Sequence, residues 1–139
     1  MIRAFSKKVK KRILLAEDDP VMRRLMELQL DDAGYDVVSV EDGRQALLYL
    51  QQEDFDLVIS DIIMPFVSGL ELLESVRKSE KDTAIVLCSA LKSHNAMAKA
   101  FEIGANGFIA KPFESNHLIN EIREIILEQE RLRGIKSAD

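Results

Sequence analysis

Acidic, hydroxyl and amino side chains follow four of the short apolar runs in this sequence, and together they could handle a phosphoryl group. Asp61 ends the run "DLVIS", and the residues after it, "IIMPFVSG", carry no charge. A lone carboxylate beside a buried run is costly to desolvate unless a cation or a reactive group meets it. The groups that could meet Asp61 follow three other apolar runs: Glu17 and Asp18, Ser89, and Lys111.

Several carboxylates that converge on one place require a positive charge. Like-charged carboxylates a few ångströms apart cannot all stay ionised without a cation. Mg²⁺ is the hard, oxygen-binding ion that is usual where a phosphoryl group is handled, and Mn²⁺ is an alternative ion for the same ligands. The acids after the first and third apolar runs are therefore expected to share a divalent cation. Asp19 is expected to cap the helix that follows it instead.

The elements that must position these residues alternate along the chain. Apolar runs predict strands at 12–16, 35–40, 56–60, 83–89 and 107–110. Segments with helical periodicity predict helices at 20–33, 42–52, 70–80, 94–105 and 115–132. Strict alternation predicts a parallel sheet with helices on both faces. In such a sheet ligands bind outside the carboxyl ends of the strands, so we expect the polar residues on one edge.

The composition indicates one α/β domain. The 139 residues are 47% hydrophobic and 31% charged, which is typical of a soluble chain with a single core. We assign residues 1–11 to a basic N-terminal extension, 12–133 to the domain and 134–139 to a polar C-terminal tail. The net charge of −5 disfavours nucleic acid as a partner. The basic residues of the extension are interpreted as a solvated lead into the first strand.

The single cysteine, Cys88, excludes an internal disulfide, and with only His94 and His117 beside it no tetrahedral metal site can be built. Cys88 lies in an apolar run, so a reduced, buried thiol and a cytoplasmic location are expected. Both histidines are expected on the surface. No apolar stretch approaches the ~20 residues of a membrane span, and no secretory signal is visible.

Four stretches of the sequence resemble the receiver domain of bacterial two-component response regulators. They are "ILLAEDDP", "DLVISDIIMPFVSGLELL", "AIVLCSA" and "GANGFIAKPF", and they fall in order at the expected strand ends. The resemblance covers residues 12–130 and implies a (βα)5 flavodoxin-like fold with strand order 2-1-3-4-5. It also implies a phosphorylated signalling switch of a phosphorelay rather than a turnover enzyme.

The resemblance assigns roles to the polar residues. It implies that Asp61 is the phosphoacceptor, whose carboxylate takes the phosphoryl group of a phosphohistidine. It implies that Asp18 and Asp61 bind Mg²⁺ directly, that Glu17 holds the ion through water, and that the backbone carbonyl of Ile63 is a further ligand. Lys111 would pair with Asp61 and then with a phosphoryl oxygen.

The same resemblance implies a conformational switch. Ser89 would donate its hydroxyl to the phosphoryl group, and Phe108 would turn into the space that Ser89 leaves. The face made by the fourth helix, the fifth strand and the last helix would change as a result. The peptide bond between Lys111 and Pro112 is expected to be cis, aiming Lys111 back at Asp61.

Implied partners are proteins rather than nucleic acid or membrane. A sensor histidine kinase or a phosphotransfer protein would supply the phosphoryl group, and an output domain or target protein would respond to it. The long last helix would suit a linker to an effector domain or a homodimer contact. A stand-alone regulator and a receiver taken from a longer chain both remain open.

The sequence departs from the usual family pattern at four positions. Val67 and Ser68 replace a methionine and an acid in the loop after Asp61, without loss of a reactive group. Ile63 and Leu91 stand two residues past Asp61 and Ser89, where family members often carry polar side chains. Aliphatic side chains there give no hydrogen bond to an in-line water, so a long-lived phosphorylated state is expected.

Three other functions compete with this one. A haloacid-dehalogenase phosphatase would carry a D-x-D motif after the first strand, and "AEDDP" lacks that spacing. A flavodoxin-like binding module would carry a loop rich in Gly, Ser or Thr to cradle phosphate, where this chain has three acids. A receiver-like scaffold that is never phosphorylated would not need the intact set of polar residues.

Overall fold

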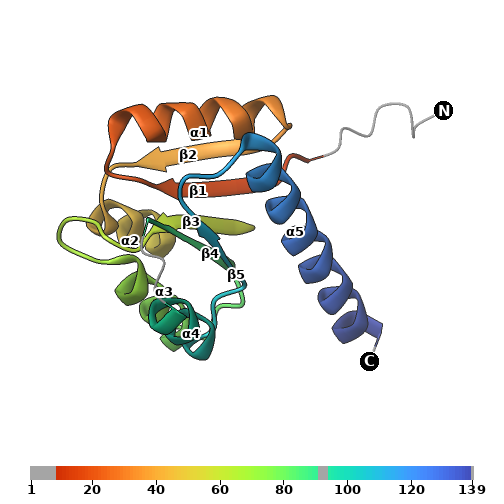
Figure 1. Cartoon of the computed structure of the whole chain (residues 1–139). Helices are drawn as coiled ribbons and strands as arrows, with labels where there is room; N and C mark the ends of the chain where they lie inside the picture. Colours follow the sequence, from red (N-terminus) through yellow and green to blue (C-terminus); the bar gives the residue numbers. More distant parts are fainter. Residues whose placement is uncertain (1–8, 91–93, 139) are drawn as a thin grey trace.

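The computed structural model describes residues 9–90 and 94–138 of the chain. Strands and helices alternate as the sequence predicts (Figure 1). The strands are β1 (Arg12–Ala16), β2 (Asp36–Val40), β3 (Leu57–Asp61), β4 (Ala84–Ser89) and β5 (Gly107–Ala110). The helices are α1 (Pro20–Asp32), α2 (Gly43–Gln52), α3 (Gly69–Lys78), α4 (His94–Ile103) and α5 (Ser115–Ala138).

The described strands form one parallel sheet in the order β2-β1-β3-β4-β5, which confirms the predicted fold class. Side chains alternate across the sheet and divide the core in two. Leu14 and Val58 pack in the cluster covered by α2, α3 and α4. Their chain neighbours Ile13 and Ile59 pack in the cluster covered by α1 and α5. Both faces of the sheet are therefore buried, as continuous aliphatic strands require.

Local capping fixes where the helices begin. The Asp19 side chain accepts a hydrogen bond from the Val21 N–H at 3.0 Å, and Asp42 accepts one from the Gln45 N–H at 2.9 Å. The expected cap at Asp19 is thus confirmed, and Asp42 caps α2 in the same way. Ser68 caps α3 in a reciprocal arrangement with Glu71, a capping box, which is why α3 begins one residue before the predicted position 70.

Other boundaries differ because contacts distant in sequence set them. β3 was expected to end at residue 60, but Asp61 is its last residue, because it pairs in register with Cys88 of β4. α5 was expected to end near residue 132 and instead continues to Ala138, through the segment expected to be a tail. Its outer half contacts the loop before β4, where Gln129 Nε2 donates to the Asp82 carbonyl at 2.8 Å. β2 begins one residue later than predicted, and α4 ends two residues earlier.

No helix within the described ranges combines the length and apolar character needed to cross a bilayer. Of the basic extension, residues 1–8 lie outside the described residues. Lys11, at the end of that extension, pairs with Glu130 of α5 at 3.3 Å.

Two glycines allow the segment after β3 to return against the sheet edge. A Cβ at Gly69 would lie 2.3 Å from the Asp61 carbonyl oxygen, and a Cβ at Gly43 would lie 2.1 Å from the Val67 carbonyl oxygen. Both distances are far inside van der Waals contact, and the opposing atoms are backbone. The loop from residue 62 to 68 therefore closes on the end of β3 and on the start of α2.

We predict that Gly69→Ala lowers the free energy of unfolding by about 3 kcal/mol, the upper range for overpacking against backbone. Gly134→Ala is the matched control, because a Cβ there meets nothing within 4 Å. In α5 it should leave stability unchanged or raise it by up to about 1 kcal/mol, since alanine favours helix. Urea denaturation followed by circular dichroism measures both. Equal stability of the two variants would contradict the close approach.

Candidate functional site

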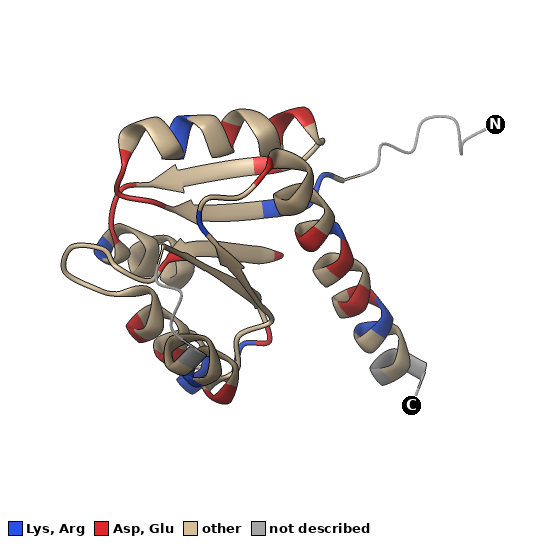
Figure 2. Ribbon diagram, in the orientation of Figure 1, with Lys and Arg blue, Asp and Glu red and all other residues tan. Residues whose placement is uncertain are grey.

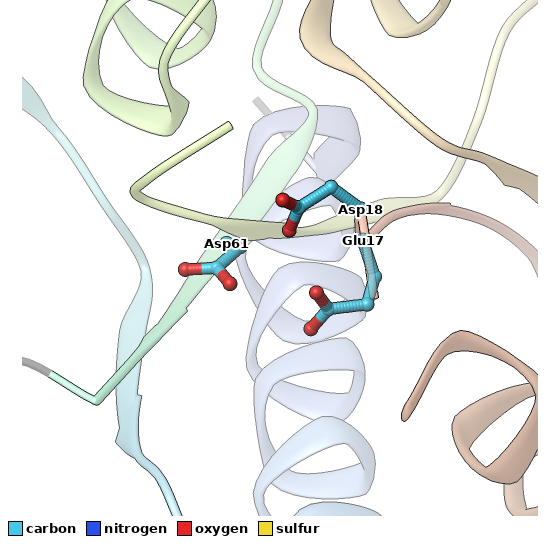
Figure 3. Close-up of side chains that lie close together, drawn as sticks. All are labelled: Glu17, Asp18 and Asp61. Atoms are coloured by element: carbon cyan, nitrogen blue, oxygen red, sulfur yellow. The ribbon is translucent and has the colours of Figure 1, made fainter. Parts of the chain in front are cut away.

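Three carboxylates meet at the carboxyl edge of the sheet. Glu17 and Asp18 follow β1, and Asp61 ends the neighbouring strand β3. One oxygen from each lies within 4.8 Å of the others, and the three side chains face a common space (Figure 3). Hard oxygen donors in this arrangement fit a divalent cation such as Mg²⁺. Acidic residues also gather along the loop after β1 (Figure 2).

Lys111 joins two of these carboxylates from the loop after β5. Its ammonium donates to Asp61 Oδ2 at 2.9 Å and also to Glu17 Oε1. The backbone N–H of Lys111 donates to the Ser89 carbonyl at 2.8 Å, so the end of β4 positions the lysine. The peptide between Lys111 and Pro112 is cis, which confirms the prediction.

Burial dominates the electrostatics of Glu17, whose side chain is 2% exposed. Desolvation raises the pKa of its carboxyl, while hydrogen bonds from Lys111 and from the Asp19 N–H partly offset that effect. For Lys111, burial alone would lower the pKa of the ammonium. The hydrogen bonds and negative charges of Glu17 and Asp61 outweigh that effect and raise it. The charged form of Lys111 is therefore favoured at this edge.

Ser89, Cys88 and Phe108 lie where the sheet order places them. Ser89 is buried at the end of β4, and Phe108 is partly buried in β5 against the core cluster beneath α4. Cys88 is buried as expected, and burial raises the pKa of its thiol to about 12. A protonated thiol is a poor metal ligand, so Cys88 belongs to the core rather than to the site.

Ile63 lies beside the phosphoacceptor candidate, with its backbone N–H donating to Asp61 Oδ1 at 3.3 Å. The residue is 62% exposed and so is not part of the core. Leu91, the second aliphatic residue expected near the site, lies outside the described residues. His117 is on the surface, as expected.

Sequence reasoning missed a hydrogen bond from Arg23 that supports the pair Glu17 and Asp18. Arg23 of α1 donates from Nη1 to the Glu17 carbonyl at 2.8 Å, which ties the loop after β1 to the first turn of the helix. No charge pattern or periodicity in the sequence indicates this contact, because its acceptor is a backbone carbonyl. A second missed contact places the Arg44 guanidinium 3.9 Å from the centre of the Phe66 ring.

Comparison with known proteins shows which family has a similar sequence. Residues 13–123 match the response regulator receiver domain family. A probable transcriptional regulator ycf27 of Porphyridium aerugineum is 35% identical over 84% of this chain and 48% of its own length. The transcriptional regulatory protein YkoG of Bacillus subtilis is 33% identical over 91% of this chain and 54% of its own length. The chain thus spans about half the length of these relatives.

Solved structures agree with the sequence relatives. The chemotaxis response regulator CheY4 of Vibrio cholerae superposes with a TM-score of 0.79 at 31% identity, over 84% of this chain and 99% of that one. A CheY-like receiver domain protein of Methanospirillum hungatei superposes with a TM-score of 0.84 at 28% identity, over 88% of this chain and 98% of that one. The family match, the strand order and the acidic edge agree, and the chain belongs to the response regulator receiver domain family.

Proposed function

We propose that this domain accepts a phosphoryl group on Asp61 from a phosphohistidine protein of a two-component phosphorelay. The observation that carries the proposal is that the Asp61 carboxylate pairs with the Lys111 ammonium and also lies close to two further carboxylates, those of Glu17 and Asp18. Family membership supports it independently.

The chemistry requires one nucleophile and accurate positioning. An oxygen of the Asp61 carboxylate attacks phosphorus and forms the P–O bond of an acyl phosphate. The P–N bond to the histidine breaks, and its electron pair remains on the imidazole nitrogen. Lys111, already 2.9 Å from Asp61 Oδ2, would then pair with a phosphoryl oxygen, while Ser89 would donate its hydroxyl to another.

A divalent cation is part of this proposal. Glu17, Asp18 and Asp61 would hold Mg²⁺, together with the backbone carbonyl of Ile63. When bound, the ion supplies neutralising charge for the phosphoryl oxygens. The chain itself contributes Arg23, whose contact with the Glu17 carbonyl holds the acidic pair at the strand end.

Phosphorylation would bias a two-state element. Ser89 moves toward the phosphoryl group, Phe108 turns into the vacated space, and the surface of α4, β5 and α5 changes. The partners are a sensor histidine kinase or phosphotransfer protein as donor, and an output domain or target protein as receiver of the signal. The names of the relatives point to transcriptional regulation as the output. The buried, reduced Cys88 supports a cytoplasmic setting.

We predict that acetyl phosphate with Mg²⁺ adds the mass of one phosphoryl group to the parent chain and none to Asp61→Asn. Asp18→Asn should weaken Mg²⁺ binding by about ten-fold or more, because an anionic oxygen ligand is lost at a cost of ~1.4 kcal/mol or more. Asp19→Asn is the matched control, since its side chain caps α1 and asparagine caps equally well. Intact mass spectrometry and calorimetric titration give the two readouts. Full labelling of Asp61→Asn would show that the nucleophile is another residue.

We predict that phosphorylation changes amide hydrogen exchange across residues 94–125, around Lys99, Phe108 and Ile122. The reason is that Phe108 packs against the cluster beneath α4, so turning its ring alters the support of that helix. Hydrogen exchange read by mass spectrometry measures the change, and Asp61→Asn under the same conditions is the control. Identical exchange before and after phosphorylation would rule out this switch.

We predict that the Ile63→Asn, Leu91→Glu double variant loses its phosphoryl group about ten-fold faster than the parent. Polar side chains there would hold an in-line water, lowering a barrier that the aliphatic pair raises by ~1–2 kcal/mol. Leu127→Asn, an exposed aliphatic residue of α5, is the control. Decay is followed by phosphate release at saturating Mg²⁺. If the double variant decays no faster than the control, aliphatic shielding does not set the lifetime.

A further inference from the structure

Phe66 occupies a position that folding alone does not favour. The residue is 69% exposed, and its backbone φ is +71°. The Val67 N–H donates to the Pro65 carbonyl at 2.8 Å, which closes a γ-turn with Phe66 at its centre. This conformation is strained for a bulky residue, and glycine or asparagine would adopt it more easily. An exposed aromatic side chain in a strained turn therefore needs a reason other than stability.

Arg44 holds the Phe66 ring in a defined place. Its guanidinium lies over the ring face at 3.9 Å, a cation–π contact between α2 and the loop after β3. The backbone contact of Gly43 with Val67 fixes the two segments against each other just beside this pair. The ring is thus exposed yet positioned, which lowers the entropic cost of using it as a binding anchor.

The loop that carries Phe66 begins and ends at the phosphoacceptor candidate. It leaves from Asp61, and Gly69 returns close to the Asp61 carbonyl. In Figure 1 this loop, between β3 and α3, projects beyond the carboxyl ends of the strands. Ile63, also exposed, lies on the same loop. Any protein that brings an imidazole within bonding distance of Asp61 must approach across this edge.

We propose that Phe66, positioned by Arg44, is an anchor for the protein that delivers the phosphoryl group, and so contributes to donor specificity. The inference rests on the proposed function, because it needs a donor that approaches Asp61. Aromatic side chains are enriched in protein interfaces, and a few residues that the partner buries completely supply most of the binding energy. A small donor such as acetyl phosphate does not reach beyond the carboxylates and gains nothing from the ring.

Two donors separate this inference from the proposed function. The protein donors are the autophosphorylated histidine kinases and phosphotransfer proteins of the source organism, screened for the one that labels the parent chain fastest. Phe66→Ala should raise the KM for that donor so that kcat/KM falls about ten-fold, with kcat nearly unchanged. Labelling by acetyl phosphate should be unchanged. Arg44→Ala should shift KM in the same direction by a smaller factor.

Matched variants exclude a merely structural effect. Phe101→Ala removes another exposed aromatic, 46% exposed near the end of α4, and should leave transfer from the protein donor unchanged. Phe66→Gly should give the transfer defect of Phe66→Ala while keeping or raising the thermal midpoint, because it relieves the positive φ.

Each contrary result has a definite meaning. If acetyl phosphate does not label the parent chain, the proposed function is overturned. If acetyl phosphate labels the parent chain normally but Phe66→Ala leaves the KM for the protein donor unchanged, the anchor alone is overturned. The same holds if acetyl phosphate labels the chain and no protein donor in the screen does. A change from dimer to monomer in Phe66→Ala with an unchanged KM would assign the ring to a contact between copies of this chain instead.

Discussion

The attraction of one ammonium group for two carboxylates, one just after β1 and one at the end of β3, organises the carboxyl edge of this sheet. Glu17 is buried beside Asp61, and their mutual repulsion would be expensive in a medium of low dielectric constant. Lys111 lies between them with only 14% of its side chain exposed. Removing the lysine would leave a buried charge without its partner, the costliest way to break such an arrangement. The strand order is what brings β1, β3 and the loop after β5 to the same point.

Sequence patterns predicted the fold well because the signals for it are local. Aliphatic runs such as "RILLA" mark strands by themselves, and caps such as Asp42 act within three residues. The predicted ends of strands and helices were less accurate where contacts distant in sequence determine them. The end of β3 follows from pairing with β4, and the outer half of α5 follows from Asp82, which lies far away in the sequence.

The same division applies to the site. Its carboxylates and lysine could be predicted, because each follows an apolar run and parallel strands must end together. Arg23 and Arg44 could not be predicted, since their partners are a backbone carbonyl and an aromatic face rather than an opposite charge. Contacts of this kind leave no mark in charge pattern or periodicity. They depend on how α1 and α2 pack against the loops at the carboxyl edge of the sheet.

The length of α5 has a mechanical consequence. The helix has 24 residues, and Ile126 is its last member in the buried core cluster. At ~1.5 Å per residue, the segment beyond Ile126 projects about 18 Å, so a tilt of about 10° would carry its tip about 3 Å. Asp82 contacts this segment twice, because its carbonyl accepts a hydrogen bond from Gln129 and its carboxylate pairs with Arg133. The end of α5 can therefore move by this amount only if the turn before β4 moves with the helix, or if the contacts of Asp82 with Gln129 and Arg133 break.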